Sequence, residues 1–223
     1  MRLNTFLHLL AAPALALLMA CGGAATGPGP QLPPASAGLV YENPKSGDWT
    51  LQRNAASTDT HLVLDLVGPA TGKFRGVGFN LKSDGSVAYG RLSSAGYIRD
   101  TGVFKLQSTY ANYPVEPVLL AGGVKQDGKL LTVGIFQKDR YWPSVAVNKP
   151  VCQIAIDFDA TKTAVLAPGT QIPLTITKAM AIPSYIGSMP ADPSDLNGYG
   201  SVIAYYNTSL VPVQITVGTL TTK

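Results

Sequence analysis

The chain holds few of the side chains on which most enzyme sites depend. Its 223 residues include only two histidines and two cysteines, and charged residues make up 13% of the total. Since only His61 lies beyond the N-terminal apolar run, sites built on several histidines, such as the common zinc centres, are excluded. The chain also has no Gly-x-Ser-x-Gly elbow and no glycine-rich phosphate loop. We therefore expect no enzymatic activity.

Clusters of basic residues are missing as well. The formal net charge is +4, but the lysines and arginines are scattered along the chain. A nucleic-acid-binding domain concentrates them on one face or along one helix. No stretch of useful length shows the 3.6-residue apolar period of a core helix. We expect neither a nucleic-acid partner nor a helical core.

Residues 1–20 have the organisation of an export signal, with Arg2 followed by the apolar run Phe6–Leu18. This run is too short to cross the roughly 30 Å hydrocarbon layer of a membrane as a helix. The sequence Leu18-Met19-Ala20-Cys21 resembles a bacterial lipobox, at which a diacylglyceryl group is attached to the cysteine. The resemblance implies a lipoprotein signal peptide over 1–20 and a lipid anchor on Cys21. The alternative is an ordinary secretory peptide cut after Ala20, which leaves Cys21 unmodified.

Residues 21–38 are rich in glycine and proline and carry no charge. Such a segment cannot bury enough apolar surface to offset the entropy of ordering, so we expect a flexible linker. Gly22, rather than an aspartate, follows the cysteine, and by resemblance to enteric sorting rules this favours the outer membrane over the inner one. We expect a lipid-anchored protein of the cell envelope.

Residues 39–223 are expected to form one all-β domain. Short alternating segments bounded by glycine and proline dominate, among them Trp49–Arg53 and His61–Val67. Further strands are expected over Cys152–Phe158, Ile172–Thr177, Ser201–Tyr206 and Val213–Val217. Apolar runs on both sides of Asp127-Gly128 predict a hairpin. The pattern is typical of a two-sheet antiparallel β-sandwich.

Three details of these strands can be checked against a structure. Cys152 shares the apolar face of its strand, which predicts a buried thiol that behaves as a small hydrophobe. His61 opens its strand on the face opposite Leu62, which predicts an exposed side chain. Gly76 and Gly78 suggest bulges or a close approach of a neighbouring backbone.

The run Phe74–Leu81, the Asp127-Gly128 hairpin, and Ile154–Phe158 before Pro168-Gly169 resemble cohesin-type modules. These modules belong to a wider group of carbohydrate-binding β-sandwiches. The resemblance covers roughly Leu62 to Thr177, and it implies a jelly-roll-like sandwich that acts as a binding module. It does not imply a dockerin partner, because one module on a lipid anchor is unlike a scaffold of many cohesins.

Four loop aromatics are candidate ligand-binding residues: Tyr110, Tyr113, Tyr141 and Trp142. Aromatic rings stack on the apolar faces of sugars, and nearby Asn and Arg side chains supply donors. The same residues could instead cover the ends of the sandwich core.

Two sets of acidic residues could carry other chemistry. Asp157 and Asp159 lie two apart on a strand, where they could bind a cation, act as an acid–base pair, or form a solvated edge. Asp195 and Asn197 occupy positions of an EF-hand-like calcium loop. Tyr199 and Tyr206 stand where that loop needs oxygen ligands, so a plain turn is the alternative. Apart from this calcium we expect no cofactor.

The leading hypothesis is a non-catalytic, membrane-anchored module that binds an envelope protein or polysaccharide. A structural lipoprotein of an envelope assembly is the second hypothesis. A glycan-active enzyme that uses Asp157, Asp159 or Asp195 is the third.

Overall fold

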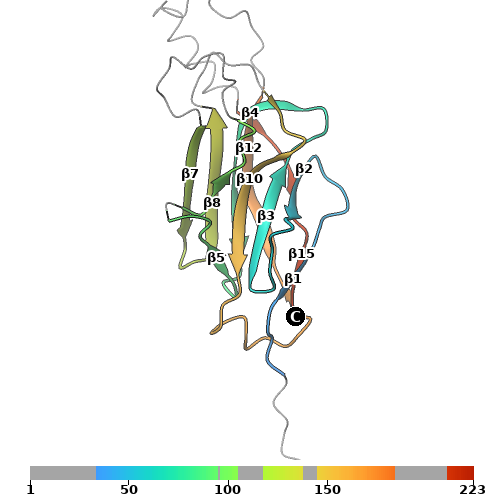
Figure 1. Cartoon of the computed structure of the whole chain (residues 1–223), viewed down its shortest axis with the longest axis vertical. Coiled ribbons are helices and arrows are strands. Elements are labelled where there is room, and N and C mark those ends of the chain that lie inside the picture. The colour runs from blue at the N-terminus through green and yellow to red at the C-terminus, as the bar shows by residue number, and fades with distance from the viewer. Residues whose placement is uncertain (1–33, 95, 105–117, 138–144, 184–209) are drawn as a thin grey trace, which may run out of the picture. The chain divides into compact units, whose positions relative to one another are not determined.

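The computed structural model describes residues 34–94, 96–104, 118–137, 145–183 and 210–223, and every regular element in these ranges is a β-strand (Figure 1). The all-β class expected from the sequence is confirmed. Apolar residues that alternate with polar ones place one face of each strand in a core and leave the other outside. Three sheets result, two with six strands and one with three.

Sheet B runs in the order β14-β2-β3-β10-β5, and β6 also pairs with β10. Its strands are β2 (Trp49–Arg53), β3 (His61–Val67), β5 (Ala88–Gly90), β6 (Arg99–Asp100), β10 (Pro150–Asp157) and β14 (Ile215–Thr216). All its pairings are antiparallel except that of β14 with β2, which is parallel. The expectation of purely antiparallel sheets was wrong at this edge, because the chain reaches β14 from the other sheet and not through a hairpin.

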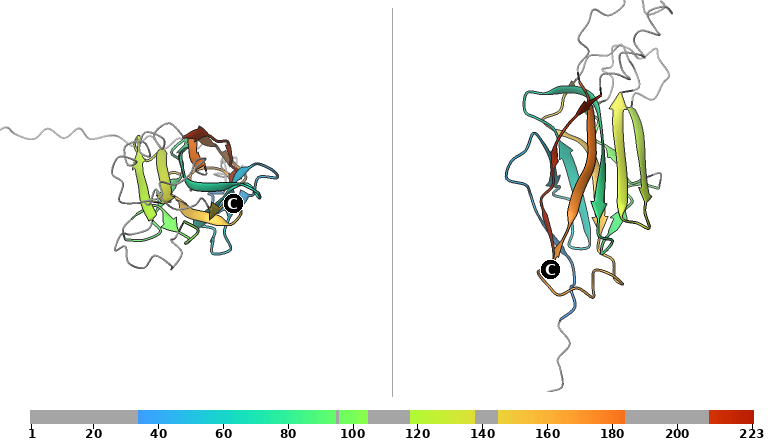
Figure 2. Two further views of the ribbon diagram at one scale, coloured as in Figure 1. Left: turned by 90° about the horizontal axis from the view of Figure 1, so that it is seen from above. Right: turned by 180° about the vertical axis from the view of Figure 1, so that it is seen from behind.

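Sheet C runs in the order β13-β12-β4-β8-β7, and β9 also pairs with β4. Its strands are β4 (Lys73–Ser83), β7 (Val118–Lys125), β8 (Leu130–Gln137), β9 (Val145–Ala146), β12 (Leu174–Pro183) and β13 (Val211–Pro212). Four long strands, β12, β4, β8 and β7, lie side by side, and the view from behind shows them (Figure 2, right).

The small sheet A has the order β1-β15-β11, formed by β1 (Leu39–Glu42), β15 (Thr219–Thr222) and β11 (Gln171–Ile172). It lies where two segments change sheets. One segment leaves β11 at Pro173 and continues as β12 of sheet C, and the other passes from β14 of sheet B into β15. The strand expected over Ile172–Thr177 is therefore divided, because Pro173 has no N–H with which to continue a ladder.

One core lies between the sheets. Sheet B contributes Trp49, Leu51, Leu62, Leu64, Leu66, Cys152, Ile154 and Ile156, and sheet C contributes Val77, Phe79, Leu81, Leu131, Val133 and Ile135, all buried in one cluster. The inward positions expected for the strands around Trp49, Leu62 and Cys152 are confirmed. Full burial of a large apolar side chain contributes roughly 1.5–3 kcal/mol, so this alternation drives the fold.

The Asp127-Gly128 hairpin is confirmed between β7 and β8, which pair from Val118–Gln137 to Lys125–Leu130. Its turn has positive φ at Gln126 (53°), Asp127 (53°) and Gly128 (88°). The main-chain N–H of Lys129 closes the turn on the carbonyl of Gln126 at 3.1 Å. Glycine adopts this conformation without the steric cost that a side chain brings.

The two ends of the domain lie together, because β1 pairs with β15. Ser36 and Ala37, in the range expected for the linker, donate main-chain hydrogen bonds to the carbonyls of Leu166 and Lys223. The packed part of the chain thus begins before Leu39. No helix suited to spanning a membrane occurs in the described ranges.

Candidate functional site

The candidate site residues Cys21, Tyr110, Tyr113, Tyr141, Trp142, Asp195 and Asn197 lie outside the described residues, as do Tyr199 and the strand expected over Ser201–Tyr206. The strand ends that flank three of the undescribed segments are nevertheless close together. Val118 faces Gln137, and Phe74 faces both Val145 and Pro183. Val118, Gln137, Val145 and Pro183 therefore lie at the same end of sheet C. In the parts of the chain that the structure describes, no group of three or more His, Cys, Asp or Glu residues could hold a metal ion.

The expectation that Asp157 and Asp159 share the face of one strand was wrong. β10 ends at Asp157, whose Oδ1 lies 2.5 Å from Nδ1 of His61 on the neighbouring strand β3. Asp159 lies in the following turn, where its carboxylate accepts hydrogen bonds from the hydroxyl and main-chain N–H of Thr161. These bonds hold the pKa of Asp159 below its ordinary value. The two carboxylates therefore serve separate local structures and do not form a pair.

His61 lies on the outer side of its strand, partly exposed, and it has a partner that the sequence did not indicate. Its side chain is 38% exposed, and that of its partner Asp157 is 37% exposed. Gly90 lies against the same carboxylate, since a Cβ built there would come within 2.6 Å of Asp157 Oδ1. The missing side chain leaves room for the His61–Asp157 contact, where β3 begins and β10 ends. Sequence alone could not show this contact, because its partners are 96 residues apart.

Cys152 is fully buried, as expected. Burial raises the pKa of its thiol, and the nearby carboxylates of Asp100 and Asp65 raise it further. A nucleophilic cysteine needs a low pKa and access to solvent. This thiol stays protonated and packs as part of the core.

The outer face of sheet B carries a cross-strand row of polar side chains. Gln52 faces Asp65, Asp65 faces Gln153, and Gln153 faces Arg99. Gln153 Nε2 donates to Asp65 Oδ1 at 2.9 Å, and Asn54 Nδ2 donates to Asp65 Oδ2 at 2.8 Å. We call these five residues the polar row. Asp65 is only 8% exposed, so the two amides fix a carboxylate that is largely removed from water.

The chain itself covers part of the same face. Leu92 packs on Val63 and Ala155 in a small buried cluster separate from the main core. Arg99 donates to the carbonyl of Leu92 at 2.8 Å and holds this segment in place. The outer face of sheet B is thus closed by internal contacts.

The outer face of sheet C is built differently. Since Val77, Phe79 and Leu81 point into the core, the intervening residues of β4 point outward. The outward positions that line up across β12, β4 and β8 form what we call the C face: Gly76, Gly78, Asn80, Lys82, Thr132, Gly134, Phe136, Lys178, Met180 and Ile182.

The C face has an apolar end and a basic end. Phe136, Met180 and Ile182 are half-buried around the glycines, whereas Lys82 and Lys178 are exposed at the other end. None of the ten residues is acidic. The nearest carboxylates along the chain belong to turns that follow β4 and β7. The face can therefore offer apolar contact and positive charge to a partner.

Glycines keep the C face flat. A Cβ at Gly76 would lie 2.3 Å from the Cβ of Phe136, so Phe136 occupies the space that a side chain would need. The close backbone approach that the glycines suggested is thus confirmed. The pairing with β8 has no bulge from Gly76 to Lys82, but the pairing with β12 shifts register between Gly76 and Phe74, so the expected bulge occurs on that side.

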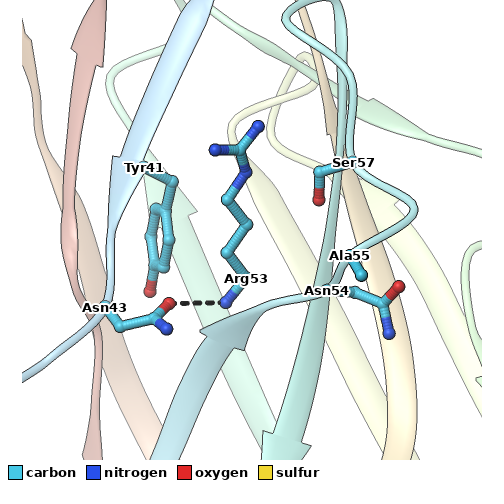
Figure 3. A pocket seen from close by; sticks show the side chains of 6 residues that line it. All are labelled: Tyr41, Asn43, Arg53, Asn54, Ala55 and Ser57. Carbon is cyan, nitrogen blue, oxygen red and sulfur yellow. Dashed lines mark hydrogen bonds between the residues drawn. The ribbon is translucent and has the colours of Figure 1, made fainter.

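A cavity of about 450 Å³ lies beside β1 and β2 (Figure 3). Its lining residues are Tyr41, Asn43, Arg53, Asn54, Ala55 and Ser57. Figure 3 shows the Arg53 side chain between Tyr41 and Ser57. Tyr41, only 4% exposed, forms part of its base, and Asn54 joins its wall to the polar row. Sequence reasoning gave no signal for this site, because these residues come from strand ends and a loop.

No protein-family model and no curated protein sequence matches the chain. Several solved structures with a similar backbone trace are cohesin modules. The sixth cohesin of Acetivibrio cellulolyticus scaffoldin B, in complex with a Cel5 dockerin, is 10% identical with a TM-score of 0.43, and the match covers 78% of this chain and 96% of that chain. The second type II cohesin of the ScaA scaffoldin of the same organism is 9% identical, with a TM-score of 0.43 and coverages of 78% and 93%. A cohesin module from a Clostridium perfringens family 33 glycoside hydrolase is 7% identical, with a TM-score of 0.33 and coverages of 82% and 98%.

Proposed function

We propose that this chain is a non-catalytic protein-binding module that docks its partner on the C face. The observation that carries the proposal is the combination of flatness, half-exposed apolar side chains and exposed lysines on three hydrogen-bonded strands, β12, β4 and β8. A rigid sheet binds without a large loss of its own conformational entropy.

The chemistry of the C face defines the partner. Phe136, Met180 and Ile182 offer apolar area of the kind that contributes most to the binding free energy at the centre of an interface. Lys82 and Lys178 favour carboxylates on the partner next to its apolar patch, and such charges mainly accelerate association. The partner is thus a protein surface with an apolar centre and an acidic rim.

The proposal includes a place for the module. A lipid on Cys21 and a flexible linker would hold the domain at the cell envelope, with the outer membrane favoured by Gly22. A tethered module meets partners at a raised local concentration, so that modest affinity suffices.

Site-directed photo-crosslinking tests the proposal. A photoreactive residue at Thr132 samples the centre of the C face, and the same residue at Gln52 samples the outer face of sheet B. We expect one discrete protein adduct from envelopes at Thr132 and none at Gln52. The added variant Phe136→Ala should greatly weaken the Thr132 adduct.

Two results would contradict the proposal. Equal adducts at Thr132 and Gln52 would mean that the C face is not selective. Retention on a polysaccharide that is lost in Trp142→Ala, without a protein adduct, would favour the glycan-binding alternative.

A further inference from the structure

The cavity beside β1 and β2 has a marked imbalance between hydrogen-bond donors and acceptors. None of its lining residues belongs to sheet C, so its properties do not depend on the proposed role of the C face. Four of the six lining residues have a side-chain oxygen: Tyr41, Asn43, Asn54 and Ser57.

The amide oxygens of the two asparagines are already engaged. Asn43 Oδ1 accepts the main-chain N–H of Arg53 at 2.6 Å. Asn54 Oδ1 accepts the main-chain N–H of Ala56 at 2.8 Å, and its Nδ2 donates to Asp65. The amide group of Asn43 is thereby oriented with its oxygen toward the backbone, which leaves its NH₂ group as a donor.

The two hydroxyl groups are engaged as well. Ser57 Oγ accepts the N–H of Val63 at 3.0 Å and donates to the carbonyl of the same residue at 2.9 Å. The Tyr41 hydroxyl accepts the N–H of Gly218 at 2.7 Å and donates to the carbonyl of Leu51 at 2.9 Å. These bonds make the base of the cavity rigid and use the acceptor atoms that a ligand would otherwise contact.

Arg53 supplies the charge. Within the described residues no carboxylate lies within 4 Å of its guanidinium. Its positive charge contributes to the lowered pKa of Asp59, but the main causes are the hydrogen bond and the charge of Lys223, whose ammonium binds that carboxylate. The guanidinium therefore keeps its donors for a ligand.

We infer that this cavity binds a carboxylate, and that the carboxylate belongs to an aspartate or glutamate side chain of a protein. The parallel N–H groups of a guanidinium match the two oxygens of a carboxylate, and the NH₂ group of Asn43 is a second donor elsewhere in the cavity lining. A free amino acid would bring an ammonium next to Arg53, and a sugar acid would bring hydroxyl donors to a wall whose oxygens are engaged. An acidic side chain avoids both conflicts.

Binding is tested by NMR on the purified protein, with the Nε–H signal of Arg53 and the Nδ2 signals of Asn43 as reporters. The probe is propionate, which reproduces the end of a glutamate side chain, and propionamide is its neutral control at matched ionic strength. We expect saturable shifts with propionate and at least tenfold weaker binding of propionamide. Arg53→Gln should abolish the response, whereas Arg91→Gln, which alters an exposed arginine stacked 5.0 Å over Tyr97, should not.

A second variant separates binding from folding. Asn43→Asp keeps the oxygen that accepts the N–H of Arg53 but replaces the donor by a negative charge, so propionate binding should be lost. The amide signal of Gly218 should stay in place, because it reports the bond to Tyr41. A response equal for propionate and propionamide, or unchanged in Arg53→Gln and Asn43→Asp, would overturn the site. Tighter binding of glucuronate than of propionate would overturn the assignment to a protein side chain.

Discussion

The outer faces of sheets B and C are made by the same kind of alternating strand but have different contents. On sheet B, Asp65 is held by the amides of Asn54 and Gln153, and Leu92 covers the neighbouring apolar positions. On the C face, glycines and half-buried apolar side chains lie beside exposed lysines. The polar groups around Asp65 on the outer face of sheet B are hydrogen-bonded to one another. The lysines and apolar side chains of the C face stay at least partly exposed to solvent.

Under the proposed function, the outer face of sheet B supports the fold and the C face binds the partner. A polar group that is nearly buried must be hydrogen-bonded, so Asp65 and the amides of Asn54 and Gln153 that bind it change only at a cost in stability. The C face has no such network among its ten residues, so stability accounts for its glycines but not for its exposed lysines and half-buried apolar side chains. Substitutions of the polar row and of the glycines should therefore lower stability, whereas substitutions of the lysines should affect binding alone.

The largest effect is expected where the C face depends on a missing side chain. In Gly76→Ala the new Cβ would collide with Phe136, and relief needs movement of two strands, which we expect to cost roughly 2–3 kcal/mol of unfolding free energy. Gly123→Ala is the matched control, because a Cβ there has no neighbour within 4 Å. It should leave stability unchanged or raise it by up to about 1 kcal/mol. Urea denaturation measures the unfolding free energy of both variants. Equal losses would show that the contact with Phe136 is not what requires a glycine at position 76.

The second-largest loss of stability is expected in the polar row. Asp65→Ala removes the acceptor of two amide groups, and we expect a loss of about 2 kcal/mol in unfolding free energy. Lys178→Ala, on the C face, should stay within about 0.5 kcal/mol of the parent. The same denaturation series tests this. A small loss of unfolding free energy in Asp65→Ala would mean that water replaces the carboxylate. The polar row would then not stabilise the fold.

The sequence was sufficient for the elements whose signal is local. Alternation placed Trp49, Leu62 and Cys152 in the core, and Asp127-Gly128 located the hairpin. Pairings between distant segments were out of reach, because Asp65 and Gln153 are 88 residues apart and their hydrogen bond leaves no local pattern. The C face was missed for another reason. Its apolar side chains, lysines and glycines come from three separate strands, and only the register brings them onto one surface.

Two buried tyrosines connect the sheets and give an alkaline limit to stability. The hydroxyl of Tyr41 bonds Leu51 and that of Tyr89 bonds Leu81, and burial is the main cause that raises the pKa of each from 10.0 to about 12. The unfolded chain loses these protons first, so each contribution is complete below pH 10 and disappears as pH rises toward 12. We expect a loss of roughly 2 kcal/mol per tyrosine over this window. Tyr89→Phe should flatten the pH profile of urea denaturation, and an unchanged slope would contradict this assignment.

The smallest effect should be electrostatic and confined to the C face. Lys178→Glu and Lys82→Glu reverse exposed charges that make no contact with the core, so the unfolding free energy should change by less than about 0.5 kcal/mol. If the partner has an acidic rim, each variant should slow association by about 3- to 10-fold at low salt. Surface plasmon resonance measures the association rate, with the partner protein that photo-crosslinking at Thr132 identifies.

Lys149→Glu is the matched control for these charge reversals, since this exposed lysine lies between β9 and β10 and outside the C face. Its association rate should equal that of the parent. The differences should also disappear near 0.5 M salt, where screening reduces the reach of exposed charges to only about 4 Å. Faster association of Lys178→Glu would mean a basic partner. The lysines would then be a solubility feature of the surface, and only the apolar end of the C face would distinguish it from the outer face of sheet B.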